Sequence, residues 1–96
     1  MSDPRIPTLR FFPDWGHPWS IWDSVGGGAV DPATYGISAA LRRRLELWTD
    51  HWSENFDPFT GWKSEEARVV SSTLGDEIFA DLQTELAPTA QVIDLR

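Results

Sequence analysis

The side chains best suited to catalysis lie in one short stretch near the N-terminus. His17 lies between Asp14 and Asp23, and an imidazole oriented by a carboxylate is a common arrangement for general acid–base chemistry. No serine or other nucleophile accompanies them at a recognisable spacing. A histidine followed by proline in a turn is more often structural. A small enzyme that uses His17 with Asp14 or Asp23 is therefore less favoured than a protein-binding module or a small-ligand binder, the two hypotheses that follow.

Tryptophans are concentrated in the same stretch. Trp15, Trp19 and Trp22 are three of the six tryptophans in the chain. A tryptophan in a loop offers a rigid, amphipathic contact surface at a small entropic cost, and tryptophan is enriched at binding hot spots. We expect these rings to bind a protein partner. The alternatives are that they stack on a small ligand or carbohydrate, or that they fold back over a core too small to close by itself.

Acidic residues are concentrated between Ser64 and Ala87, a segment that contains six carboxylates and only one basic residue, an arginine. Glu77, Asp81 and Glu85 repeat every four residues, a spacing at which like charges on a helix repel. The same row of charges becomes favourable when it lies opposite a basic partner. The simpler alternative is an acidic helix face that contacts only solvent. The residues predicted to bind a partner are Trp15, Trp19, Trp22, Asp76, Glu77, Asp81 and Glu85.

Other motifs give weaker signals. His51 and Glu54 have a spacing that can direct two side chains toward one metal, but without a second histidine or a cysteine they indicate a solvated helix end. The glycine run 26–28 lacks the residues of a phosphate-binding loop. The arginine run 42–44 indicates a salt-bridged helix surface. We therefore expect neither a metal nor a cofactor.

Composition narrows the possible partners. The chain has 96 residues, no cysteine and a formal net charge of −7. Such a charge argues against a general nucleic-acid binder and against anionic membranes, and it favours a basic protein partner. We expect no secretion signal, because the first residues lack a basic flank and an apolar run, and no apolar run in the chain approaches the roughly 20 residues that cross a bilayer. We expect a cytoplasmic protein.

The termini have the residue types of strands. Residues 6–12 are rich in branched and aromatic side chains, with Leu9 and Phe11 on one face, and residues 92–95 form a second strand candidate. We expect these two strands to pair. Residues 13–36 show no sustained periodicity and are predicted to be one long loop, with 19–25 as an alternative third strand and 31–34 as a helical turn.

Two helices are predicted between the strands. Apolar side chains spaced by three and four from Ile37 to Phe56 form one helix face, and Ser38 is its expected N-cap. Ser64 is the expected N-cap of the second helix, and Pro88 is expected to end it. Gly75 inside this helix marks either a close approach of the first helix or a break into two shorter helices. The expected apolar stripe of the second helix contains Ala67, Val70, Leu74, Ile78, Leu82 and Leu86.

These elements predict one α+β domain over residues 1–96, in the order strand, loop, helix, helix, strand, with both helices packed on a small sheet of the terminal strands. The charge and the tryptophans favour a small acidic, non-enzymatic interaction protein. An inhibitor, antitoxin or immunity-type protein that occludes a basic partner fits this description best.

Overall fold

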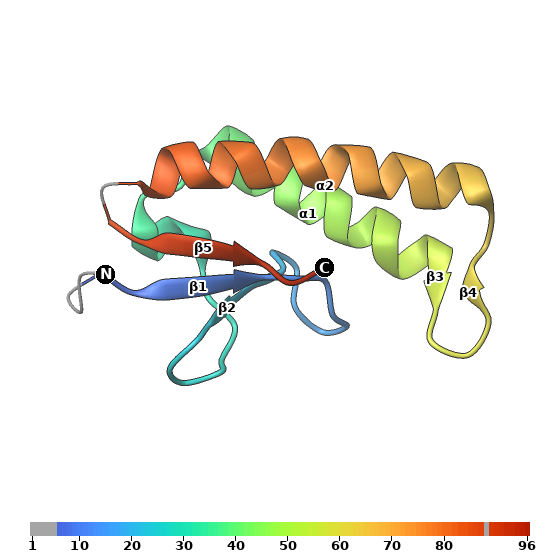
Figure 1. The fold of residues 1–96 in the computed structure, drawn as a ribbon, viewed down its shortest axis with the longest axis horizontal. Coiled ribbons are helices and arrows are strands. Elements are labelled where there is room, and N and C mark those ends of the chain that lie inside the picture. The colour runs from blue at the N-terminus through green and yellow to red at the C-terminus, as the bar shows by residue number, and fades with distance from the viewer. Residues whose placement is uncertain (1–5, 88) are drawn as a thin grey trace.

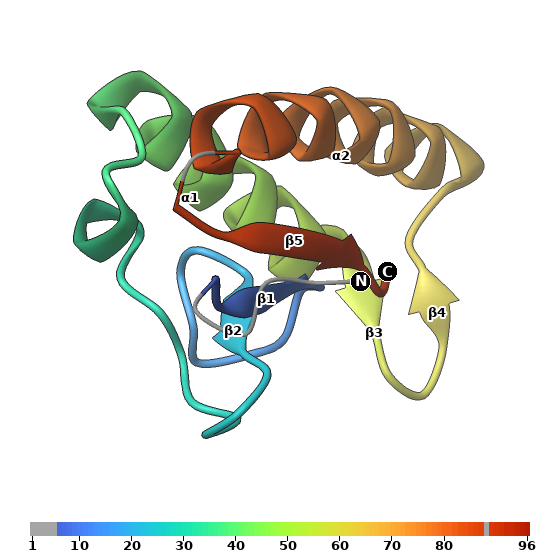
Figure 2. The same cartoon turned by 60° about the vertical axis from the view of Figure 1, so that its left-hand side comes forward.

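The computed structural model describes residues 6–87 and 89–96, and these residues form an α+β fold (Figure 1). Both long helices lie on the same side of a three-stranded sheet, and a short hairpin extends from the end where the helices are joined (Figures 1 and 2). The elements in chain order are β1 (Thr8–Phe11), β2 (Ile21–Asp23), a 3-10 helix η1 (Pro32–Tyr35), α1 (Ala39–Asn55), β3 (Phe56–Asp57), β4 (Gly61–Trp62), α2 (Glu65–Leu86) and β5 (Gln91–Asp94).

The sheet has the strand order β2-β1-β5. The terminal strands β1 and β5 pair with each other, as the sequence predicted. The structure adds that the pairing is parallel and that Leu9 lies opposite Val92. Antiparallel β2 places Ile21 opposite Phe11. The 13–36 segment is therefore not a loop throughout, and the alternative of a third strand is confirmed for Ile21–Asp23. The predicted helical turn is also confirmed as η1, which Asp31 caps by accepting a hydrogen bond from the Ala33 N–H.

The helices begin where their capping serines predicted. Ser38 accepts a hydrogen bond from the Leu41 N–H at the start of α1, and Ser64 does the same for Ala67 at the start of α2. Side-chain caps of this kind satisfy N–H groups that have no partner within the helix. Helix α2 continues through Gly75 without a break. Pro88, which we expected to end this helix, lies outside the described residues.

The predicted apolar stripe of α2 is correct at Ala67 but wrong at Val70 and Leu74. Val70 and Leu74 are 38% and 40% exposed, whereas Ser71 and Gly75 are buried. The reason is the missing side chain at Gly75, since a Cβ there would collide with the Arg96 guanidinium and lie 3.2 Å from Trp48 Cζ2. The helix is rotated so that its small residues face these two large side chains.

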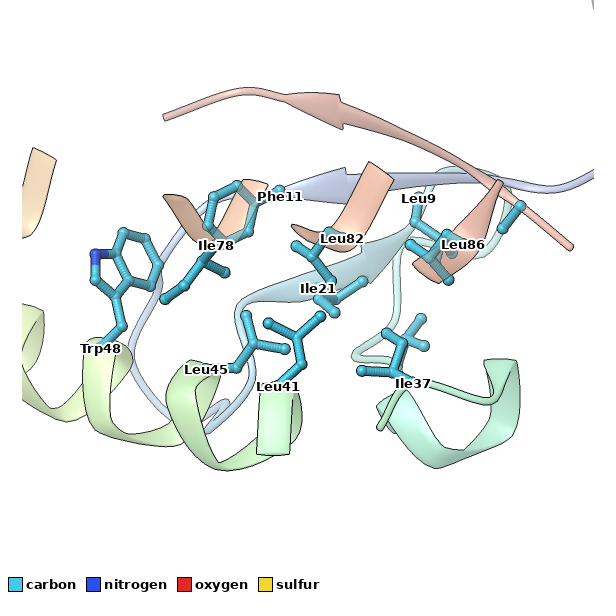
Figure 3. Packing of buried hydrophobic residues seen from close by; sticks show 12 residues of the cluster. Leu9, Phe11, Ile21, Ile37, Leu41, Leu45, Trp48, Ile78, Leu82 and Leu86 are labelled. Carbon is cyan, nitrogen blue, oxygen red and sulfur yellow. The ribbon is translucent and has the colours of Figure 1, made fainter. Parts of the chain in front are cut away.

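The core lies between the helices and the sheet. Figure 3 shows side chains from β1, β2, α1 and α2 meeting there, among them Leu9, Ile21, Leu45 and Leu82, which are fully buried. The predicted face of α1 supplies one side of this core. Within the described residues, no helix has the length and apolar character needed to cross a membrane.

Candidate functional site

The three tryptophans predicted to bind a partner have different environments. Trp15 is 46% exposed and packs against Trp52 of α1, with 4.3 Å between ring centroids. Trp19 is partly buried, donates its Nε1–H to Glu46 and lies beneath the Arg42 guanidinium. Trp22 donates its Nε1–H to the Phe12 carbonyl. Trp19 and Trp22 therefore hold the loop to the fold, and Trp15 has the largest surface free for contact.

His17 lies inside the structure. Its side chain is buried, and Nε2 lies 2.8 Å from the Ile21 carbonyl oxygen, to which it donates. Burial lowers the pKa of His17 because the charged imidazolium is poorly solvated there. Asp14 and Asp23 accept hydrogen bonds from the backbone N–H groups of Trp15 and Val25. Within the described part of the chain, neither carboxylate is hydrogen-bonded to His17, so the predicted catalytic pair is not assembled in this structure.

The acidic residues of α2 are partly engaged by the rest of the chain. Asp81 forms an ion pair with Arg44 of α1. Glu85 accepts hydrogen bonds from the backbone N–H of Ser38, at 2.6 Å, and from its hydroxyl. The repulsion expected in this row is therefore relieved by α1, which supplies a cation and the positive end of its dipole. Of the three residues, Glu77 is the fully solvent-facing one.

Asp76 belongs to a second ionic cluster on the opposite side of α2. Arg96 donates to Asp76 at 2.6 Å, to Asp94 at 2.7 Å and to the Ser72 carbonyl. These bonds lower the pKa of Asp94 and raise that of Arg96, because each partner stabilises the charged form of the other. The Arg96 guanidinium also lies 5.5 Å from the centre of the Phe11 ring.

A cavity of about 510 Å³ opens beside this cluster, a size typical of ligand pockets. We call it the aromatic cavity. Three tryptophans from two elements form its apolar wall, and charged or hydroxyl side chains of α2 and of the C-terminal segment form its polar wall. The lining residues are Pro13, Trp48, Trp52, Trp62, Arg68, Ser71, Ser72, Asp94 and Arg96.

The tryptophans of this cavity are not the three that the sequence singled out. Trp48 is fixed by a hydrogen bond from its Nε1–H to the Ser71 carbonyl. Trp52 stacks on Phe56, and Trp62 meets the same ring edge-on across the β3–β4 hairpin. Exposed Trp15 contacts Trp52 and so adjoins the cavity. No local pattern in the sequence could have found this site, because its walls come from segments distant in the chain.

Large apolar side chains are also exposed near this end of the molecule. Phe59, in the turn between β3 and β4, is 94% exposed. Asp57 holds this turn by accepting hydrogen bonds from the N–H groups of Phe59 and Thr60. A rigid turn that presents a phenylalanine to solvent has the features of a binding surface.

Metal binding finds no support in the described residues. Within 6–87 and 89–96, no three or more histidine, aspartate or glutamate side chains gather closely enough to hold a metal ion. His51 and Glu54 lie on α1 without a third such group.

Comparison with known proteins gives one match. A family model described as Serratia CdiI immunity protein-like matches residues 7–94, which include every helix and strand of the fold. No curated protein matches the chain.

Proposed function

Since the chain belongs to the Serratia CdiI immunity protein-like family, we propose that it neutralises a protein toxin by binding it directly and occluding its working surface. The match over residues 7–94 is the observation that carries this proposal. An immunity protein acts by binding, so the chain needs a contact surface and not a catalytic centre. The environment of His17 is consistent with this role.

The proposed contact surface is the end of the molecule that carries the aromatic cavity. Exposed Trp15 and Phe59 supply apolar anchors, and the aromatic cavity, whose lining residue Trp52 contacts Trp15, can receive a side chain of the toxin. Hot spots of protein interfaces are commonly aromatic residues that become desolvated beside a pocket. Trp19 and Trp22 act indirectly in this proposal, by holding the loop that presents Trp15.

The proposed toxin is basic. The chain carries a net charge of −7, and a potential of that sign accelerates association with a positively charged partner. Among the α2 carboxylates predicted to bind a partner, Glu77 is the one whose charge is proposed to act on the toxin alone. Asp81 and Glu85 also stabilise the fold, through Arg44 and Ser38. Asp76 shares Arg96 with Asp94 and contributes less.

Growth protection tests the proposal. The cognate toxin domain is expressed from an inducible promoter in a bacterial host, with and without the chain. We expect the chain to restore growth and to bind the purified toxin domain. Growth that stays inhibited at matched expression of the two proteins contradicts the proposal.

Single variants then locate the surface. We expect Trp15→Ala to weaken toxin binding by about 2 kcal/mol, roughly 30-fold in Kd, with the fold intact because the ring is half exposed. Glu77→Gln should slow association at low salt and have little effect at high salt. Val25→Ala is the matched control, since Val25 is 92% exposed in the separate turn after β2. Equal losses in Val25→Ala and Trp15→Ala would place the interface elsewhere.

A further inference from the structure

The two edges of the three-stranded sheet differ in how they are protected. The outer edge of β2 is covered by the segment that follows it, through hydrogen bonds from the Asp23 N–H to the Gly28 carbonyl and from the Val30 N–H to the Ile21 carbonyl. Trp22 and Ala29 form a bridge between them. Strand β5 forms the other edge, and within the described residues it pairs with β1 alone.

The backbone of β5 presents hydrogen-bonding groups on its open side. The N–H groups of Gln91 and Leu95 donate to the Pro7 and Phe11 carbonyls, both at 2.9 Å, so they point toward β1. Successive residues of a strand direct their N–H and C=O groups to opposite sides. The corresponding groups of Val92 and Asp94 therefore point away from β1. An edge of this kind is a template for a further strand.

A groove of about 330 Å³ lies beside this edge. Its walls are Gln83 and Ala87 from the end of α2 and the run 90–93, which includes the first three residues of β5. Ala87 and Ala90 have short side chains, which leaves room between the helix and the strand. Ile93 is 47% exposed on β5 itself. The edge therefore combines directed backbone groups with an apolar recess.

We propose that β5 accepts an extended segment of the toxin as a fourth strand of the sheet. This inference rests on the proposed function and names its binding mode. In strand addition the backbone hydrogen bonds provide affinity, and a pocket for alternate side chains provides specificity. The Val92 and Asp94 backbone groups would supply the hydrogen bonds that give affinity. The groove would give specificity by receiving one small apolar side chain.

Charge selects a basic toxin segment over a second copy of this chain. Two copies would each carry a net charge of −7, so like-charge repulsion opposes their association. At the Asp94 end of the edge, the two carboxylates of Asp76 and Asp94 share the single guanidinium of Arg96, and the Asp76 side chain is 69% exposed. A lysine or arginine of the toxin segment would be favoured at this end.

Proline at position 92 is the sharpest variant. Val92→Pro removes an N–H that points away from β1 and places the proline ring on the open edge, so the β1–β5 ladder keeps its bonds. Val92→Ala is the matched control, because it loses side-chain packing but retains the N–H. We expect Val92→Pro to weaken binding of the purified toxin domain by about tenfold or more and Val92→Ala by about threefold or less.

Amide hydrogen exchange of the wild-type chain gives a second measurement, which decides the matter even if Val92→Pro fails to fold. We expect the Val92 and Asp94 amides to exchange more slowly in the toxin complex than in the free chain. Unchanged exchange in a formed complex overturns strand addition and leaves the proposed function standing, whereas absence of any complex overturns both. A dimer of the free chain that Val92→Pro dissociates would assign the edge to a second copy and overturn the proposal.

Discussion

Gly75 offers a quantitative test of how α2 packs against the C-terminal segment. Alanine is favoured over glycine inside a helix by about 1 kcal/mol. In this structure the new methyl group would displace the Arg96 guanidinium, which bonds Asp76 and the Ser72 carbonyl beside that position. The Arg96–Asp76 ion pair contributes about 0 to 1 kcal/mol, because the Asp76 side chain is 69% exposed. We therefore expect Gly75→Ala to change the free energy of unfolding by less than about 0.5 kcal/mol.

The same substitution should behave differently once the arginine is gone. In an Arg96→Ala background we expect Gly75→Ala to stabilise the fold by up to about 1 kcal/mol, because the helix preference is then offset only by the tight contact with Trp48. Urea denaturation followed by far-ultraviolet circular dichroism of all four chains gives the coupling energy. Thr73→Ala, at an exposed position of the same helix, should change stability equally in both backgrounds. A coupling energy below about 0.3 kcal/mol for Gly75 would refute the described packing.

Three further predictions concern stability. In urea denaturation, Trp48→Ala should lower the free energy of unfolding by about 3 to 5 kcal/mol. The control Leu47→Ala, at the neighbouring position that is 51% exposed, should change it by no more than about 0.5 kcal/mol. A loss below about 1 kcal/mol for Trp48→Ala would contradict the burial of Trp48 in the core. The folded-state pKa of His17 lies below the unfolded value of about 6.5, so stability should be full above that pH and fall as the pH is lowered through it. His17→Gln should flatten this part of the stability profile, and an unchanged slope would exclude His17 as its source. Glu85→Gln should lower the free energy of unfolding by about 1 kcal/mol, because it weakens the hydrogen bonds to Ser38 at the start of α1. An unchanged thermal midpoint would show that these hydrogen bonds do not stabilise the fold.

Periodicity allowed much of the fold to be predicted. The face of α1 was correct because its apolar residues repeat over several turns and its large side chains fill the core. The terminal strands were correct because β-branched and aromatic residues cluster there. Strand β2 is three residues long, too short for alternation to be distinguished from a loop, and its pairing with β1 depends on tertiary contact.

The errors have one physical origin, since local patterns do not contain contacts between distant segments. Ser71 and Gly75 replace Val70 and Leu74 on the buried face because Trp48 and Arg96 need space there. The aromatic cavity joins the loop after β1, both helices, β4 and the C-terminal segment. The sequence shows the acidic residues of α2 only as a row on one helix, whereas Asp81 and Glu85 bond to α1 and Asp76 bonds to the C-terminal segment.

Direct titration of the toxin domain with this chain tests the central claim most closely. Isothermal calorimetry of the cognate toxin domain should show saturable 1:1 binding that weakens as ionic strength rises, in parallel with protection of growth. The account would be contradicted by a folded chain that leaves the active toxin domain unbound at low ionic strength.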